Sequence, residues 1–320
     1  MTTILYIAGY GRSGSTLLDM YLGMNGGVIG MGELTHVLRE WRDDASCSCG
    51  TSFRHCSFWQ AVFAQFQQMT PDIPVADAVR ISRAVEKNPL GYKRGLGGKL
   101  TQQQLHYQRI WSNLVAAISS ISQAHVIVDS SKSARLVTSR AAALQRVAQL
   151  ETKVIHLVRD PRAVMWSYLR GNNLELAKGN AIAKQGGAYR MLLSWVTTNV
   201  GVHWLARNAQ LPVIRVRYED FVADPKRTVA RIGDHFGLTF DNLGATTSAT
   251  PSALDAAHGV AGNRIRRAGV QPLKLDNEWE GQLRPALRKM ALLSWPLMQA
   301  YGYVPPTRQS SLMQGARREI

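Results

Sequence analysis

The octapeptide GYGRSGST, residues Gly9–Thr16, lies between an apolar run and the start of a helical pattern. The residues before it, Thr3–Ala8 (TILYIA), are predicted to form a buried strand, and Ser15–Met24 the helix after it. Where a strand leads through a glycine-rich turn into a helix, backbone N–H groups converge and the helix N-terminus adds partial positive charge. We therefore predict a phosphate-binding loop at Gly9–Thr16. The alternative is a glycine-rich turn that binds nothing.

Apolar runs alternate with helical patterns along the rest of the chain. Further strands are predicted at Val28–Met31, His125–Asp129, Lys153–Val158 and Pro212–Arg217. Further helices are predicted at Ala134–Leu150, from Pro161 onward, at Gly187–Ala209, and from Asp224–Pro225 to Phe236. This alternation is typical of an α/β fold with three layers, in which helices flank a central parallel sheet on both faces. We expect one domain over residues 1–304, with a helical insertion at about 34–124, and a flexible basic tail over 305–320.

Composition limits the possible partners without choosing among them. The chain has 320 residues, 45% of them hydrophobic, and a formal net charge of +16, which favours anionic partners. No block of five or more like charges occurs, so nucleic acid is not the expected partner. The N-terminus has no basic n-region, and no run of about 18 apolar residues occurs. These features predict a soluble, cytoplasmic protein without a membrane span.

One position separates two classes of phosphate loop. A nucleotide triphosphatase loop carries lysine where this chain has Ser15, and Arg12 supplies a cation within the loop instead. The longer segment GYGRSGSTLLDMYLG resembles the 5′-phosphosulfate loop of the sulfotransferase family, whose members have a P-loop-like fold. Those enzymes use 3′-phosphoadenosine-5′-phosphosulfate (PAPS) as donor. The resemblance implies that the donor is surrounded by Gly11, Arg12, Ser13, Gly14, Ser15 and Thr16.

A second phosphate site is predicted from Arg159 and Ser167. Arg159 ends a strand, and Ser167 lies eight residues later, near the same face of the following helix. A guanidinium and a hydroxyl placed in this way can hold one phosphate. Sulfotransferases have this pattern, which implies a clamp for the 3′-phosphate. A local ion pair of Arg159, for example with Asp160, is the alternative.

Two weaker segments also resemble the family. Tyr218, in the stretch RYEDF, matches a tyrosine that approaches the nucleotide, although a buried aromatic at a strand end is the competing interpretation. The segment HGVAGNRIRR resembles a late element that closes over the nucleotide, with a basic surface loop as the alternative. The matching residues of that element are Gly262, Asn263 and Arg266, and Arg264 stands where the family often has proline.

Sulfuryl transfer to a hydroxyl requires a base for the acceptor proton and cations for the leaving nucleotide. Glu33 follows a strand and resembles the base of the tyrosylprotein sulfotransferase branch. A carboxylate that stabilises a helix dipole is the alternative, and His36 is the rival base. Lys132 also follows a strand and resembles the lysine that contacts the bridging oxygen, with Arg12 sharing the charge. A solvated lysine is the alternative. No metal is required for this chemistry.

The cysteines Cys47, Cys49 and Cys56 lie close together in the sequence. Their odd number, without a signal peptide, argues against a disulfide framework. The spacing C-x-C-x6-C beside His55 is not a standard zinc spacing. Similar segments occur in some bacterial sulfotransferases, so we expect a structural loop, with zinc as the minority alternative.

Two other functions stay open. Asp129 ends the apolar run VIVD, as does the magnesium-binding aspartate of nucleotide triphosphatases, so a small-molecule kinase using ATP–Mg is the first alternative. A non-catalytic basic protein that binds polyanions is the second. The predicted partners are a nucleotide donor, with adenosine 3′,5′-bisphosphate (PAP) as its product, and a hydroxyl-bearing acceptor of unspecified chemistry. The sequence does not specify the oligomeric state.

Overall fold

A parallel sheet forms the centre of the molecule. This computed structural model describes residues 2–88, 90–93, 98–132, 139–170, 185–240, 258–260, 273 and 275–304. Within them lie five strands in the order β2-β3-β1-β4-β5, and all neighbours are parallel. The strands are β1 (Thr3–Ala8), β2 (Val28–Gly30), β3 (Val126–Asp129), β4 (Glu151–Val158) and β5 (Val213–Arg217). The predicted fold class is confirmed, and all carboxyl ends of the strands meet at one edge.

Helices follow the strands, as the sequence predicts. They are α1 (Ser15–Leu22), α6 (Arg140–Arg146), α7 (Pro161–Leu169), α9 (Gln185–Ala209), α10 (Tyr218–Ala223) and α11 (Pro225–Phe236). In the described part of the helix predicted at Ala134–Leu150, the helix ends at Arg146 because Gln149 adopts a left-handed conformation (φ 56°) before β4. Residues 133–138 lie outside the described part. Gly262, Asn263, Arg266 and the tail 305–320 also lie outside it.

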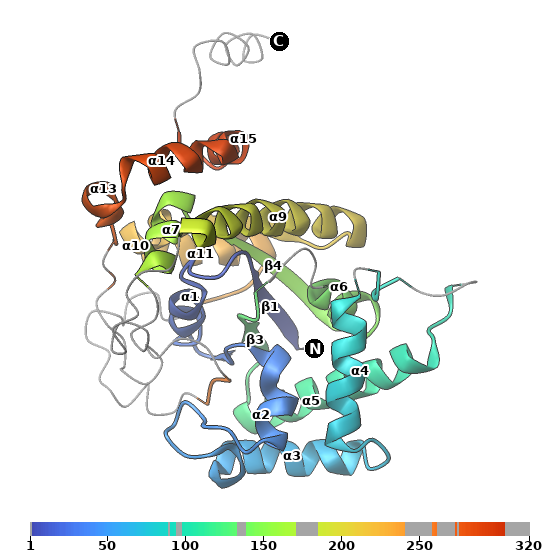
Figure 1. Cartoon of the computed structure of the whole chain (residues 1–320). Helices are drawn as coiled ribbons and strands as arrows, with labels where there is room; N and C mark the ends of the chain where they lie inside the picture. The colour runs from blue at the N-terminus through green and yellow to red at the C-terminus, as the bar shows by residue number, and fades with distance from the viewer. Residues whose placement is uncertain are drawn as a thin grey trace, which may run out of the picture.

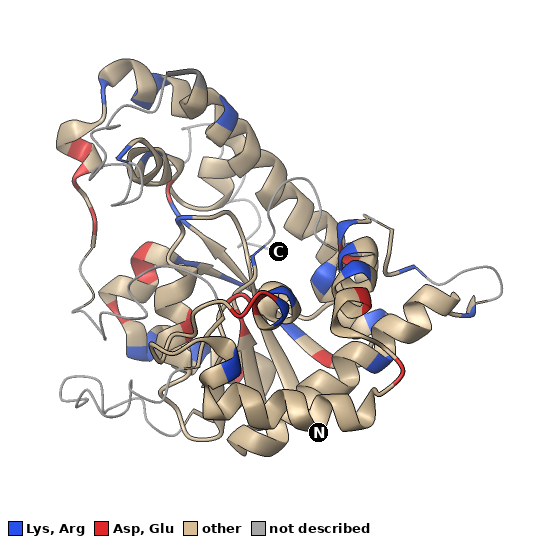
Figure 2. Ribbon diagram, turned by 60° about the horizontal axis from the view of Figure 1, so that its bottom comes forward, with Lys and Arg blue, Asp and Glu red and all other residues tan. Residues whose placement is uncertain are grey.

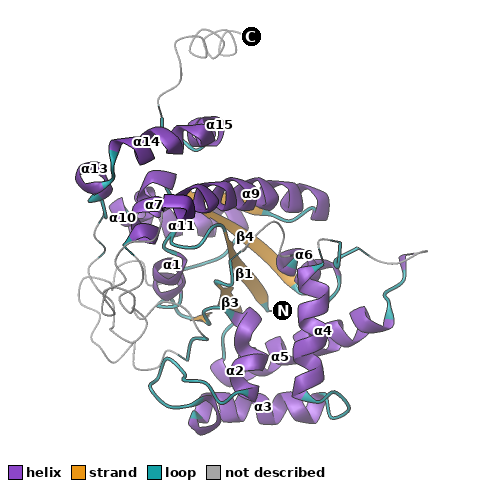
Figure 3. Ribbon diagram, viewed as in Figure 1, coloured by secondary structure: helices purple, strands orange, loops and turns teal. Residues whose placement is uncertain are grey.

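The residues between β2 and β3 form the predicted helical insertion. It contains the 3₁₀ helices η1 (Leu34–His36) and η2 (Phe53–His55), and the helices α2 (Val37–Arg42), α3 (Ser57–Met69), α4 (Val75–Lys87) and α5 (Gln102–Ser122). These helices gather on one side of the molecule in Figure 1. Further short helices, α13 (Trp279–Gln282), α14 (Pro285–Ala291), η6 (Leu292–Ser294) and α15 (Trp295–Ala300), follow near the end of the chain. Figure 3 shows α13–α15 outside α7 and α9, and α14 contacts both of those helices.

The side chains of β1 alternate between two hydrophobic clusters, because successive residues of a strand face opposite sides of a sheet. Leu5 and Ile7 join the cluster that contains α1 and α11. Ile4, Tyr6 and Ala8 join the larger cluster formed with the insertion, α6 and the second half of α9. Both faces of the sheet are therefore covered.

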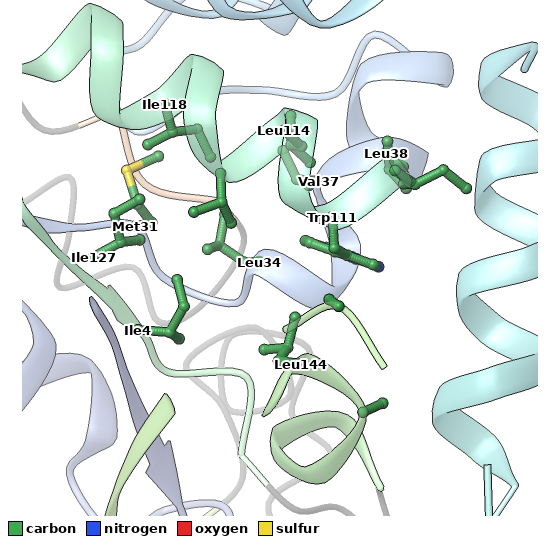
Figure 4. Packing of buried hydrophobic residues seen from close by; sticks show 14 of the residues in the cluster. Ile4, Met31, Leu34, Val37, Leu38, Trp111, Leu114, Ile118, Ile127 and Leu144 are labelled. Carbon is green, nitrogen blue, oxygen red and sulfur yellow. The ribbon is translucent and has the colours of Figure 1, made fainter. Parts of the chain in front are cut away.

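The larger cluster anchors the chain immediately after β2. Met31 and Leu34 are fully buried and lie among Ile118, Leu114 and Ile127 (Figure 4). Glu33 lies between Met31 and Leu34 in the sequence, so the core fixes the backbone on both sides of Glu33. Of the helices in the described residues, none is long and apolar enough to cross a bilayer.

Candidate active site

The glycine-rich loop lies at the carboxyl end of the central strand. Gly14 is the N-cap of α1 with φ 87°, and a side chain there would overlap the ring of Tyr218. A Cβ at Gly9 would overlap the carbonyl of Leu157 on β4, so both glycines are sterically required. Ser13 is buried, and its hydroxyl has no protein partner among the described residues. A buried hydroxyl at the start of a helix is suited to an anion that approaches the loop.

Arg12 is exposed at the top of this loop and has a positive φ of 68°. Only a few non-glycine residues adopt this conformation, and they are frequent at functional sites. Its carbonyl oxygen accepts a hydrogen bond of 3.0 Å from the guanidinium of Arg159. The loop after β1 and the residue at the end of β4 are therefore tied together.

Arg159 is 6% exposed and lies between three groups. Besides Arg12, it contacts Asp276 at 3.3 Å, and its guanidinium lies 4.4 Å from the ring centre of Tyr218. Its Nε and one oxygen of Asp276 are buried and have no hydrogen-bond partner within the described part of the chain. A buried guanidinium with a donor that no described residue accepts, beside the glycine-rich loop, is suited to an anionic group. The sequence carries no signal for Asp276, because it lies far along the chain.

Asp160, next to Arg159, has partners of its own. Its carboxylate accepts hydrogen bonds from the backbone and side chain of Arg162, and its backbone N–H donates to Glu219 at 3.0 Å. Burial raises the pKa of Glu219, which also accepts a hydrogen bond of 3.0 Å from Tyr303. Arg159 therefore does not form the local pair with Asp160 that the sequence left open.

Glu33 is held in place by residues from three parts of the chain. Its N–H donates to the carbonyl of Val260 at 2.9 Å, and the N–H of Val260 donates to Met31 at 2.7 Å. The N–H of Gly32 donates to Asp19 of α1 at 3.1 Å. Glu33 is the N-cap of η1, but its side chain makes no capping hydrogen bond. The Glu33 carboxylate therefore lies at the start of η1 without a hydrogen bond to the first backbone N–H groups of that helix.

The Glu33 carboxylate instead pairs with Lys132. The ammonium Nζ donates to Oε1 of Glu33 at 2.6 Å, and both side chains are about one-fifth exposed, at 21% and 18%. Lys132 follows β3 with φ 63°, and its carbonyl accepts a hydrogen bond of 2.6 Å from the buried Tyr6. The structure thus brings together the two residues that the sequence proposed as base and charge stabiliser.

His36 lies on the other side of Glu33. Its Nε2 is 3.6 Å from Oε2 of Glu33. Burial lowers the pKa of His36, and the neighbouring Arg39 lowers it further, whereas Glu33 and Glu40 raise it. The imidazole is therefore mainly neutral at pH 7, and a neutral imidazole can accept a proton.

Asp129, the residue that would bind magnesium in a kinase, belongs to a buried ionic network. One carboxylate oxygen accepts from Arg140 Nε at 2.9 Å, and the other accepts from the N–H of Ser131 at 3.0 Å and from its hydroxyl. Arg140 is 1% exposed and also pairs with Glu86. Glu86 accepts a further hydrogen bond of 2.9 Å from Thr35. The network fixes the segments that carry Lys132 and Glu33.

The other residues predicted for the donor site lie in the loop, on α1 and on α7, or outside the described residues. Ser15 and Thr16 are buried in the first turn of α1, and Gly11 is half-buried in the loop. Ser167 is half-buried on α7, and no hydrogen bond joins it to Arg159. Gly262, Asn263 and Arg266 fall outside the residues that the structure describes.

The carboxyl edge of the sheet therefore carries the loop after β1, with Lys132 and Glu33 on one side and Arg159 and Tyr218 on the other. The sequence profile of the Sulfotransferase family matches residues 5–242, which include each of these groups, strands β2 to β5 and most of β1. This chain belongs to the sulfotransferase family. A comparison with curated proteins gives no match.

Solved structures of other sulfotransferases resemble this one. The sulfotransferase domain of the Synechococcus PCC 7002 olefin synthase is 21% identical, with 95% of this chain and 96% of that domain aligned and a TM-score of 0.52. The sulfotransferase domain from the curacin biosynthetic pathway is 17% identical, with 96% and 99% aligned and a TM-score of 0.45. The first similarity indicates that this sulfotransferase shares its fold with the olefin synthase domain.

Proposed function

We propose that this sulfotransferase uses PAPS as donor and transfers its sulfuryl group to a hydroxyl acceptor, with Glu33 as the base. The observation that carries the proposal is the Glu33–Lys132 pair at 2.6 Å, which lies at the same sheet edge as the loop Gly9–Gly14. Ligands of open α/β sheets bind outside the carboxyl ends of the strands, where the strand order reverses. Here the reversal occurs at β1, the strand that the loop follows.

The residues at this edge fit the two anionic ends of the donor. The backbone of the loop, the start of α1 and the hydroxyl of Ser13 are suited to the 5′-phosphosulfate. Arg159 supplies a buried cation for the 3′-phosphate, with an Nε that has no partner among the described residues, and Tyr218 lies beside it. Ser167, Gly262, Asn263 and Arg266 remain proposed donor contacts that rest on the family resemblance.

In the proposed reaction, the acceptor oxygen forms a bond to sulfur as the bond from sulfur to the bridging oxygen of PAPS breaks. The acceptor proton goes to the carboxylate of Glu33. PAP leaves with the electron pair of the broken bond, and Lys132 and Arg12 stabilise its added negative charge. Lys132 has two proposed roles. Before the reaction its ammonium holds the Glu33 carboxylate in place, and during the reaction it stabilises the charge on the leaving PAP.

The same contacts weigh against a kinase. In a kinase the strand-end aspartate must be open to magnesium. Both carboxylate oxygens of Asp129 instead have buried protein partners, and an ion there would have to displace Arg140. Ser15 also occupies the position of the kinase lysine.

The distribution of charge weighs against a general polyanion-binding protein. Such a protein needs a basic face or stripe. In Figure 2, Lys and Arg are spread over helices on several sides of the described structure and are interspersed with Asp and Glu. Over the part of the chain that Figure 2 colours, the positive charges therefore do not form the single basic face expected for that function.

Calorimetric titration of the purified chain tests the donor. We expect PAP to bind without added metal, and ATP–Mg to bind much more weakly. Tight ATP–Mg binding with indifference to the 3′-phosphate would contradict the proposal. A screen of hydroxyl compounds with labelled PAPS then identifies the acceptor class.

A further inference from the structure

Four metal-binding side chains meet at a place outside the donor site. Cys47, Cys49, Cys56 and His258 each offer one ligand atom, and these atoms all lie within 4.8 Å of one another. The Nδ1 atom of His258 is 3.2 Å from the Cys56 sulfur and 3.9 Å from the Cys47 sulfur. All three cysteines are free thiols.

This arrangement matches the dimensions of a tetrahedral zinc centre. Zinc bonds of about 2.3 Å to sulfur and 2.0–2.1 Å to nitrogen place neighbouring ligand atoms about 3.5–3.8 Å apart. The four atoms of the cluster need only small side-chain movements to reach these separations. Three cysteines and one histidine are also a common ligand set of structural zinc sites, which bind no water.

The backbone presents the first two cysteines in a tight turn. The N–H of Gly50 donates to the carbonyl of Cys47 at 3.1 Å, and the N–H of Cys47 donates to Thr51 at 2.8 Å. Ser46 and Ser52 pair as an antiparallel bridge below the turn. Cys49 of the turn lies seven residues before Cys56, and the sulfurs of both turn cysteines lie within 4.8 Å of the Cys56 sulfur.

His258 is fixed from several directions. Its ring stacks on Phe58 with the ring centres 4.7 Å apart, and its carbonyl accepts a hydrogen bond of 3.1 Å from Trp59. Ser48 donates to the carbonyl of Gly259 at 2.8 Å. Cys47 and Cys56 are almost fully buried, at 0% and 2% exposure. Two of the four groups are therefore buried, and His258 is held against them by contacts with Phe58 and Trp59.

The fourth ligand could not be read from the spacing of the cysteines. His55 is next to Cys56 in sequence, but its Nδ1 bonds to the hydroxyl of Ser52 at 2.8 Å, and it does not belong to the cluster. His258 arrives from the far end of the chain. The nonstandard spacing C-x-C-x6-C therefore describes only the three cysteines and leaves out the fourth ligand, His258.

We propose that Cys47, Cys49, Cys56 and His258 bind a structural zinc ion. Coordination joins the helical insertion to the segment 258–260, and each cysteine that binds loses its thiol proton to solvent. The segment also pairs with the active-site edge, because Val260 bonds to Met31 and Glu33. The ion would thus fix the backbone of Glu33, a consequence that rests on the proposed function of Glu33.

Metal analysis of the full chain tests the site directly. Protein purified under reducing conditions without chelator should contain about one zinc per chain. Zinc-depleted protein should take up Co²⁺ and develop the visible bands of tetrahedral cobalt with a thiolate charge-transfer band in the near ultraviolet. Neither measurement depends on sulfotransferase activity.

Two variants and a matched control assign the ligands. Cys49→Ser, at the most exposed of the three cysteines, and His258→Ala should each lose most of the zinc, and the cobalt spectrum should change. The control His55→Ala removes a neighbouring imidazole outside the cluster and should keep about one zinc per chain. If a variant does not fold, the cobalt spectrum of the wild-type chain still decides the question.

Several outcomes would overturn the proposal. They are a reduced wild-type chain that holds no zinc and gives no cobalt–thiolate band, equal zinc loss in His55→Ala and His258→Ala, or a disulfide among the three cysteines in freshly reduced, air-protected protein. If zinc binds and PAPS does not, the site stands while the proposed donor fails.

Discussion

The carboxylate of Glu33 has two neighbours that can take part in proton transfer, Lys132 at 2.6 Å and His36 at 3.6 Å. Replacement by glutamine keeps the shape and a hydrogen-bond acceptor for Lys132, but it removes the proton acceptor. We expect Glu33→Gln to lower kcat about 10²–10⁴-fold, the usual contribution of a general base. PAP affinity, measured by calorimetry, should change little.

The matched control is His36→Gln, which removes the rival base and leaves Glu33 and Lys132 paired. It should retain most of the turnover in the same labelled-donor assay. If His36→Gln loses turnover and Glu33→Gln does not, the base is His36.

Arg159 is the residue whose guanidinium we expect to bind the 3′-phosphate. Hydrogen bonds to charged groups contribute about 1.5–3 kcal/mol, so Arg159→Ala should weaken PAP binding at least about tenfold. Adenosine 5′-monophosphate, which lacks the 3′-phosphate, should bind wild type and variant alike. If both nucleotides lose the same affinity, the substitution has instead disturbed the loop, because it removes the hydrogen bond from Arg159 to the Arg12 carbonyl.

At the scale of elements, Arg140 connects α6 with β3 and α4. It pairs with Asp129 and Glu86, and it lies 3.9 Å above the ring centre of Trp111. Arg140→Met would leave two buried carboxylates without their cation. We expect it to lower the free energy of unfolding by about 3–5 kcal/mol, measured by chemical denaturation.

The control for that experiment is Arg80→Met. Arg80 forms an exposed pair with Asp77 at 3.0 Å on the same helix α4 that carries Glu86. Its loss should leave the denaturation midpoint nearly unchanged, because exposed pairs are screened by water. Similar midpoints for both variants would show that the buried network does not stabilise the fold.

The strands and the helices after them were predictable because their patterns are local. Apolar runs such as TILYIA have one stable environment, a strand buried on both faces, and Pro161 and Pro225 begin α7 and α11 as expected. The order of the strands was not predictable, because it depends on pairing between distant segments. The buried role of Asp129 was missed for the same reason, since Arg140 and Glu86 lie on other elements.

At the scale of the whole molecule, we expect His156 to make the free energy of unfolding depend on pH. It is buried between β4 and α9, where its Nε2 bonds to Asn199 at 2.8 Å, and burial lowers its pKa from 6.5 to about 3. The folded state therefore binds fewer protons than the unfolded state between these values. The free energy of unfolding is therefore unaffected by the titration of His156 above pH 6.5. It falls as the pH drops from 6.5 toward 3, by up to about 1.4 kcal/mol per pH unit.

His156→Gln keeps a donor for Asn199 and cannot titrate. Denaturation curves between pH 7 and pH 4 should therefore show a smaller loss of stability on acidification in the variant than in the wild type. Identical pH dependence in the two proteins would show that His156 does not control acid unfolding.

The candidate site was predictable to the extent that it follows one rule. Parallel strands end at the same edge, so Glu33, Lys132, Arg159 and the loop were expected together, and the structure places them there. The rule gives no information about residues that do not directly follow a strand of the sheet. Asp276 and His258 come from late segments without a local pattern, and only the folded chain identifies them as neighbours.

The parallel β-bridge between Gly32 and Val260 has a consequence for folding during synthesis on the ribosome. A ribosome releases the phosphate loop and Glu33 among the first residues, long before the segment that holds the Glu33 backbone. A nascent chain stopped before Val260 contains all five strands of the described sheet, but it lacks the two hydrogen bonds that join Val260 to Met31 and Glu33. Synthesis therefore completes the backbone contacts around Glu33 late, after every strand of the described sheet has emerged.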